Sequence, residues 1–182
     1  MTFARLLSLI IVIAVMAGCS GKTRVQSDFD KEADFKQYRM WDWLPGDHGM
    51  TENLMVDDEN VRKRIEGAID EGFRAIGYDR TSGAPDFFVK YYLGYGEEIN
   101  KRNIENYYAY MNYAVFVPTV TQSYIEVWET GTLIIDVIDV DEKKLVWRGL
   151  AETEVNPQAG PRENEPKLKK AIKMMLEKFP PK

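Results

Sequence analysis

Cysteine and histidine are almost absent from this chain of 182 residues, which holds one of each, Cys19 and His48. A lone cysteine leaves no second thiol for an internal disulfide. A lone histidine without companions makes a poor metal site, and we expect His48 to be a solvated residue in its glycine-rich turn. The same scarcity removes most metal-hydrolase chemistry and the serine and cysteine triads, which pair a histidine with a nucleophile. The sequence therefore predicts no cofactor and no metal.

Positive charge is scarce as well, with 24 Lys and Arg against 29 Asp and Glu and a net charge of −5. Removal of residues 1–18, argued next, takes away one arginine and leaves a net charge of −6. Nucleic-acid-binding proteins concentrate basic charge, so no nucleic-acid partner is predicted. Electrostatic adhesion of the protein surface to anionic lipid is disfavoured for the same reason.

The apolar run at the N-terminus is too short for a membrane-spanning helix. Arg5 supplies a positive n-region, Leu6–Val15 an apolar h-region, and Met16–Gly18 the stretch before Cys19. This arrangement resembles a bacterial lipoprotein signal, in which the cysteine is lipidated and becomes the first mature residue. Met16 departs from the leucine usual at that position. The alternative, a free thiol beside an ordinary cleavage site, stays open.

The signal resemblance implies three parts of the chain. Residues 1–18 are the signal peptide, 19–24 the lipidated cysteine and tether, and 25–182 a single domain, which is long enough for a real core. Ser20, rather than aspartate, after the cysteine implies the outer membrane. We therefore expect a cell-envelope protein that faces the periplasm and is held at the membrane by its N-terminal lipid.

Two strands joined by a short charged turn are predicted at residues 133–140 and 145–155. The first, residues 133–140, carries apolar side chains on both faces, which indicates a strand covered on both sides. In the second, which begins at residue 145, alternate side chains share a face. The predicted core face holds Leu145, Trp147, Gly149 and Ala151, and the opposite face holds Arg148, Glu152 and Glu154.

A three-residue loop at 141–143 would place Asp136 opposite Arg148 and Val137 opposite Trp147. An unpaired carboxylate on an apolar face is costly. We therefore predict a structural ion pair between Asp136 and Arg148. The alternative, a catalytic Asp136, has no second acid or base at a defined spacing beside it.

The other helices and strands are predicted from the spacing of their apolar residues and from the glycine, proline and capping residues that bound each segment. Trp41 and Trp43 share one face of a predicted strand, as either a buried anchor or an exposed stacking platform. The remaining strands are predicted at 23–30, 39–44, 86–93 and 124–128, with helices at 57–77 and 164–179. This order predicts an α+β fold, a mixed and largely antiparallel sheet of about five to six strands with two helices packed on one face.

Tyrosine is concentrated in one part of the chain, which holds eight of the ten between residues 91 and 124. We treat residues 95–120 as a Tyr-rich excursion, with a helix over 97–110 and extended chain over 115–120. Its rings either form a recognition surface or pack on the sheet, and both interpretations stay open. The second face of the sheet would then be covered by the excursion or by a partner. The candidate recognition residues are Tyr95, Tyr107, Tyr108, Tyr110 and Tyr113.

Several motifs form a set that runs through the mature chain. They are Asp28-Phe29-Asp30, Trp41-Asp42-Trp43-Leu44-Pro45, Gly77-Tyr78, Pro85-Asp86-Phe87-Phe88-Val89, Gly131 to Asp136, Leu145 to Gly149, and Phe179-Pro180-Pro181. On these residues the chain resembles the bacterial lipoprotein family labelled domain of unknown function 4136, with residues 95–120 the least alike. The resemblance implies an envelope lipoprotein with no assigned activity and no catalytic residues to carry over.

Two functions are therefore in competition. The first is a non-enzymatic, lipid-anchored binding or assembly module of unknown ligand, with an envelope protein as partner; no oligomeric state is predicted. The alternative is an envelope enzyme that uses carboxylates, such as a glycan hydrolase, which needs two carboxyl groups roughly 5–9.5 Å apart. Its candidates are Asp136, Asp139 and Glu152, of which Asp139 is expected to be solvated in the turn.

Overall fold

The computed structural model describes residues 23–46, 59–95, 108, 113–115, 130–156, 159 and 161–182, with the backbone alone at 49–50, 95, 114–115, 130 and 161–162. Six strands form one mixed sheet in the order β1-β8-β7-β5-β2-β4, and two short strands join it, β3 to β5 and β6 to β8. The strands are β1 Arg24–Phe29, β2 Met40–Trp43, β3 Gly49–Met50, β4 Asp79–Arg80, β5 Phe87–Tyr95, β6 Ala114–Val115, β7 Thr130–Asp139 and β8 Lys144–Glu154.

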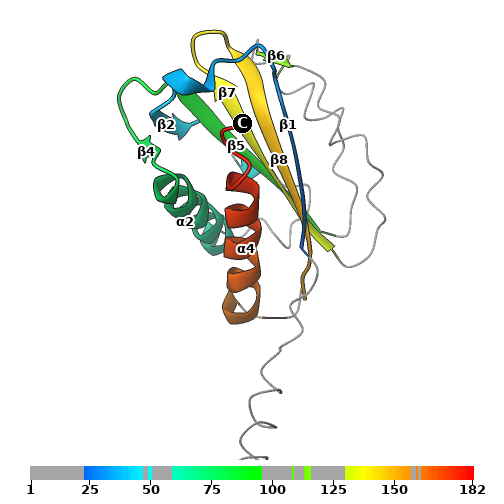
Figure 1. Ribbon diagram of the computed structural model, residues 1–182. Helices are drawn as coiled ribbons and strands as arrows, with labels where there is room; N and C mark the ends of the chain where they lie inside the picture. The colour runs from blue at the N-terminus through cyan, green and yellow to red at the C-terminus, as the bar shows by residue number, and fades with distance from the viewer. Residues whose placement is uncertain are drawn as a thin grey trace, which may run out of the picture.

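The four long strands β1, β8, β7 and β5 pair in antiparallel fashion, and β2 then pairs with β5 in parallel. Two helices, α2 (Glu59–Ala75) and α4 (Pro161–Leu176), lie side by side across one face of this sheet (Figure 1). The predicted α+β class, with its largely antiparallel sheet and two helices on one face, is confirmed. The expected strand at 124–128 lies outside the described residues.

The helix-side face of the sheet holds the larger core. Alternate residues of each strand point toward the helices, as period two requires. The buried members of this helix-side cluster include Trp41, Trp43, Phe73, Phe87, Val89, Ile135, Val137, Trp147, Ile172 and Met175. Trp41 and Trp43 are therefore buried anchors, and the idea of an exposed stacking platform is wrong.

A smaller cluster covers the opposite face of the sheet, which we call the second face. Its buried members are Leu44, Tyr92, Tyr108, Ile134, Ile138, Leu145 and Leu150. All side chains of β7 from residue 132 to 139 are buried, so this strand is covered on both sides as its sequence predicts. Tyr108 belongs to the 95–120 excursion, and it contributes directly to that cover.

The β7–β8 hairpin has the predicted pairs Asp136–Arg148 and Val137–Trp147. Beyond them the register shifts, so that Ile138 pairs with Leu145 and Val146 becomes an extra residue. The bulge lets Val146 join the helix-side cluster and sends Leu145 to the second face. The predicted core face for Leu145 and the three-residue loop are therefore wrong, because a bulge cannot be read from alternation alone.

The helices α2 and α4 begin and end within three residues of their predicted bounds. The helix α2 buries Ile65, Ala68, Ile69 and Phe73, and Gly77 follows with a φ of 91°, which only glycine adopts without strain. The helix α4 begins at Pro161, three residues before the expected start, and Pro166 lies inside it. As the sixth residue of α4, Pro166 removes one i→i−4 hydrogen bond of the helix, and the helix continues through it.

Candidate functional site

The ion pair between Asp136 and Arg148 is present at the centre of the second face. The Nε atom of Arg148 donates to Oδ1 of Asp136 at 2.6 Å, and Nη2 donates to Oδ2 at 2.5 Å. The Tyr108 hydroxyl donates to the same Oδ2 at 2.6 Å. All three side chains are 0% exposed. The bidentate geometry is the form of this contact that best offsets desolvation of both charges.

The pair belongs to a row of charges that crosses four strands. Lys90 stands opposite Asp136 on β5, and Asp28 stands opposite Arg148 on β1. The row therefore alternates in sign from Lys90 through Asp136 and Arg148 to Asp28. Lys90 is fully buried, with its ammonium 5.4 Å from the Tyr92 ring centre. The sequence predicted Tyr108 as a candidate recognition residue and not as a partner of Asp136. Lys90 was not among the predicted site residues, although a lysine in an otherwise apolar strand is itself a signal for a buried partner.

Burial and charge act together on this row. Burial raises the pKa of Tyr108 well above its usual value, and the Asp136 carboxylate raises it further. Burial acts to lower the pKa of Arg148, but the Asp136 carboxylate outweighs it and the pKa is raised. The tyrosine therefore stays neutral and the guanidinium charged at any physiological pH. Neither side chain therefore gains or loses a proton at physiological pH, which suits a structural role.

Asp139 is buried, at 3% exposure, and the expectation of a solvated turn residue is wrong. Its Oδ2 atom accepts from the Tyr38 hydroxyl at 2.7 Å and from Gln37 Nε2 at 3.4 Å. Its Oδ1 atom accepts from the backbone N–H of Glu142 at 2.7 Å, which closes the hairpin turn. Burial raises the pKa of Tyr38, and the bond to Asp139 raises it further.

The three carboxylates that the sequence offered for glycan hydrolysis do not face one another. Asp136 contacts Tyr108 on the second face, whereas Asp139 contacts Tyr38 on the helix side. Both carboxylates are engaged by structural donors, and Glu152 is half-buried on β8. These residues therefore form no pair across a cleft.

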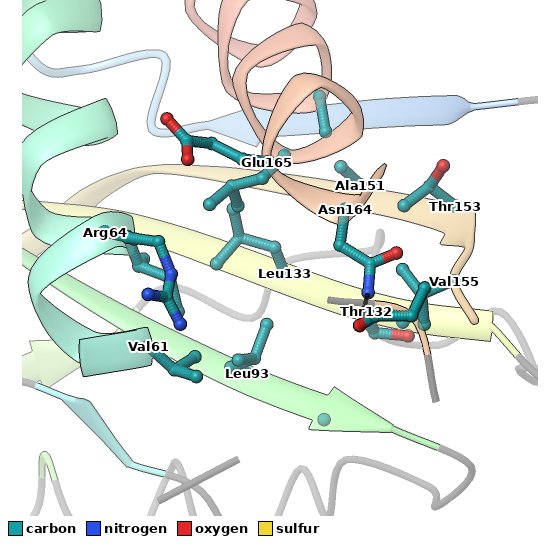
Figure 2. Close-up of a pocket in the computed structure, with 16 residues that line it drawn as sticks. Val61, Arg64, Leu93, Thr132, Leu133, Ala151, Thr153, Val155, Asn164 and Glu165 are labelled. Carbon is teal, nitrogen blue, oxygen red and sulfur yellow. Dashed lines mark hydrogen bonds between the residues drawn. The ribbon is translucent and has the colours of Figure 1, made fainter. Parts of the chain in front are cut away.

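A pocket of about 260 Å³ lies between the two helices and the sheet (Figure 2). Its walls come from α2 and α4, and its floor from the ends of β5, β7 and β8. Small residues leave the space open. The floor includes Gly94, Gly131 and Ala151, and the α4 wall includes Ala171. The apolar lining is completed by Val61, Ile65, Leu93, Leu133, Val155, Ala159 and Leu168.

A few polar side chains line the same pocket, namely Arg64, Thr132, Thr153, Asn164 and Glu165. Figure 2 shows Arg64 reaching from α2 and Asn164 from α4 toward the space between them. Asn164 Nδ2 donates to the carbonyls of Asn156 at 3.0 Å and Ala159 at 3.2 Å. That fixes the orientation of the amide, and its Oδ1 atom is buried without a hydrogen-bond partner.

The pocket lies at the end of the sheet where the chain enters the domain. Thr23, the residue before β1, has its Oγ1 atom 3.2 Å from Oγ1 of Thr153, which lines the pocket. The sequence alone does not reveal this pocket, because its lining comes from five separate elements. In the sequence, the space of this pocket is indicated by small residues alone: Gly94, Gly131, Ala151 and Ala171.

The other predicted site residues differ in burial and in whether the structure describes their side chains. Tyr108 is fully buried, so it packs on the sheet and offers no recognition surface. Tyr113 is half-buried against the same second-face cluster. Tyr95 ends β5, and its side chain lies outside the described residues, as do Tyr107, Tyr110, His48 and Cys19.

Within the part of the chain that the structure describes, no three His, Cys, Asp or Glu side chains gather where they could hold a metal ion. Among the same residues, no helix is long and apolar enough to span a membrane.

The fold and pocket define a class of protein: an α+β domain with a mixed six-stranded sheet, helices on one face and an apolar space between the layers. Residues 25–181 match the family described as Domain of unknown function (DUF4136), and the chain belongs to this family. Among curated proteins, none matches the chain.

Solved structures share the fold. A DUF4136 family protein from Bacteroides thetaiotaomicron is similar with a TM-score of 0.57 and 16% identity, over 87% of this chain and 96% of that one. A PDZ domain protein from Parabacteroides distasonis gives 0.50 and 14%, over 97% of this chain and 40% of that one. A PelC dodecamer from Paraburkholderia phytofirmans gives 0.46 and 11%, over 85% and 95%. At these identities the likeness to the first two structures concerns the fold alone.

Proposed function

We propose that this protein is a lipid-anchored cell-envelope lipoprotein that binds a small, mainly apolar ligand without transforming it. The observation that carries the proposal is the pocket between α2, α4 and the sheet, with its apolar interior and few polar groups. Ligand sites have this composition, in which apolar side chains supply affinity and a few polar groups set orientation.

The lining of the pocket favours binding over hydrolysis. Glu165 is the one carboxylate among the described lining residues. Glycan hydrolysis needs two carboxyl groups across the scissile bond. The apolar side chains offer a sugar few partners for its hydroxyl groups, whereas they suit a hydrocarbon surface.

The position of the pocket agrees with a membrane anchor at Cys19. Cys19 lies four residue steps before Thr23, whose side chain touches the pocket residue Thr153. An extended chain of four residues spans at most about 14 Å. An acylated Cys19 would therefore hold the end of the domain that contains the pocket close to the membrane surface.

The anchor is tested by fractionation of cells that express the full-length chain. We expect the protein in the outer-membrane fraction and a mature N-terminal mass that carries acyl chains. The Cys19→Ser variant should move to the soluble periplasmic fraction. An unmodified wild-type chain in the soluble fraction would disprove the anchor.

The pocket is tested with the neutral fluorescent probe 1-aminonaphthalene, whose fused rings suit a space of about 260 Å³. We expect saturable binding of one probe per chain and at least a tenfold loss of affinity in Leu93→Trp, because the half-buried Leu93 side chain projects into the pocket and an indole would fill it. A matched control is Phe88→Trp, an aromatic exchange on the same strand but on the second face. Equal affinity of wild type and Leu93→Trp would remove the pocket as the binding site.

A further inference from the structure

We infer that the ligand of this pocket is a single-chain amphiphile with an anionic head group, taken from the membrane to which the protein is anchored. The inference rests on the proposed function and specifies the ligand class. Three features of the described residues carry it: the size and apolar character of the interior, the charge at its edge, and a buried acceptor without a partner.

The interior fits one hydrocarbon chain. Its floor and walls are hydrocarbon, from Leu93 and Leu133 on the strands to Leu168 on α4. A dry apolar cavity of about 150 Å³ holds a benzene molecule, so by proportion about 260 Å³ holds roughly ten carbon atoms. That is enough for most of one medium-length chain, and too little for the two chains of a phospholipid.

The charge at the edge of the pocket selects an anion. Arg64 is half-buried and lines the pocket, and no carboxylate pairs with its guanidinium among the residues that the structure describes. Glu165, the opposite charge at the edge, has Lys169 Nζ 3.8 Å from its Oε1 atom, and the same ammonium lies 2.9 Å from Oε2 of Glu71. Arg64 is therefore the charge in the pocket lining that is left for a ligand, and its planar guanidinium suits a carboxylate or phosphate head group.

Asn164 adds a second polar requirement. Both protons of its Nδ2 atom are used by carbonyls, while Oδ1 is buried and receives no hydrogen bond. Buried acceptors in native structures nearly always have a donor. A hydroxyl or amide N–H next to the anionic group of the ligand would supply one. We therefore expect a head group that carries both an anion and a donor, as in a 3-hydroxy fatty acid.

The test compares three probes of equal chain length by calorimetry, each below its critical micelle concentration: 3-hydroxydodecanoate, dodecanoate and dodecyltrimethylammonium. The protein is the full-length chain with Cys19→Ser, which carries no lipid of its own. We expect one site per chain, with 3-hydroxydodecanoate bound more tightly than dodecanoate and the cation bound at least tenfold more weakly than either. Equal binding of cation and anion would overturn the charge assignment, and equal binding of the two anions would overturn the role of Asn164.

Two arginines on the same helix provide matched variants. Arg64→Met should weaken 3-hydroxydodecanoate binding at least tenfold, and Arg64→Lys should restore most of it. Arg74→Met removes the same charge from an exposed position of α2 outside the pocket, and it should leave the affinity unchanged. Equal losses in Arg64→Met and Arg74→Met would show a general charge effect and contradict the site.

The outcomes separate this inference from the function on which it rests. Binding of 1-aminonaphthalene without preference among the charged probes would leave the pocket as a binding site and overturn the ligand class. Loss of all binding in the folded protein would overturn both. If the lipidated wild type fails to bind while Cys19→Ser binds, the acyl chain of the protein itself occupies the pocket, and a membrane amphiphile is not the ligand.

Discussion

At the scale of single residues, the second face of the sheet is organised by charge rather than by apolar packing alone. Asp136 accepts three hydrogen bonds, two from Arg148 and one from Tyr108, in a fully buried setting. Replacing one partner leaves the others desolvated and uncompensated, which costs far more than the net stabilisation that the pair provides.

We therefore predict that Arg148→Met lowers the free energy of unfolding by about 3–5 kcal/mol. The loss arises because the Asp136 carboxylate keeps its burial and loses two donors. Urea denaturation at pH 7 measures it. Lys144→Met breaks the pair of Lys144 with Asp30, whose side chains are 26% and 11% exposed, and this control should cost less than loss of the fully buried pair. Equal losses would mean that burial of the Asp136–Arg148 pair has no energetic consequence.

A second residue-scale prediction concerns alkaline pH. Tyr38 and Tyr108 have pKa values raised above 10 by burial and by their carboxylate partners. Above pH 10 the unfolded tyrosines lose protons and the folded ones keep them, so the folded state binds more protons and stability falls as pH rises. The fall approaches about 1.4 kcal/mol per pH unit for each such tyrosine.

The measurement is the urea midpoint between pH 8 and pH 11. Tyr38→Phe should be less stable than wild type at pH 8, because Asp139 loses a donor. Its midpoint should then fall less steeply above pH 10. A slope identical to that of the wild type would show that Tyr38 does not hold its proton in the folded state.

The sequence predicted some of these residues and not others, for a physical reason. The pair of Asp136 and Arg148 could be predicted because the alternation of side chains along a strand and the position of the turn are local features of the sequence. Asp139 was misjudged because its donors, Gln37 and Tyr38, come from a segment about 100 residues away. Such long-range donors leave no local trace, and the same holds for Tyr108.

At the scale of elements, α2 and α4 approach closely where glycine permits it. A Cβ atom on Gly72 would lie 2.7 Å from Leu176 Cδ1 and 3.0 Å from Ile172 Cγ2, both in buried side chains of α4. A Cβ atom on Gly67 would meet nothing within 4 Å. The same helix therefore contains one glycine that packing requires and one that it does not.

We predict opposite effects of alanine at these two positions. Gly67→Ala should raise the free energy of unfolding by up to about 1 kcal/mol, from helix propensity alone. Gly72→Ala gains the same propensity but overpacks the helix contact, which costs about 1–3 kcal/mol, so its net effect should be a loss. Thermal and urea unfolding of both variants check this. A gain in Gly72→Ala as large as in Gly67→Ala would show that α4 moves away at no cost.

The helices and strands themselves could largely be predicted, because the spacing of apolar residues and the capping residues are local features of the sequence. The bulge at Val146 could not, since alternation continues through it and the register is set by pairing with β7. The pocket also lay beyond the sequence, because Arg64, Leu93 and Asn164 meet only after the helices have packed on the sheet.

At the scale of the whole molecule, one sheet carries two clusters of core residues, and β7 and β8 contribute to both. Ile135 and Val137 point to the helix side, while Ile134 and Ile138 point to the second face. Loss of packing on one face loosens strands that the other face needs. The domain should therefore unfold in one cooperative transition.

A substitution on the second face should therefore lower the stability that a probe on the helix side reports. Leu150 is 3% exposed in the second-face cluster, and Leu150→Ala should cost about 2–5 kcal/mol. Trp41, Trp43 and Trp147 lie in the helix-side cluster, whereas the fourth tryptophan, Trp128, lies outside the described residues, so the comparison is made in a Trp128→Phe background. The urea midpoint from tryptophan fluorescence should fall together with the midpoint from far-UV circular dichroism. If dichroism changes in two steps while the fluorescence midpoint stays at the wild-type value, the faces unfold separately, and the shared strands do not couple them.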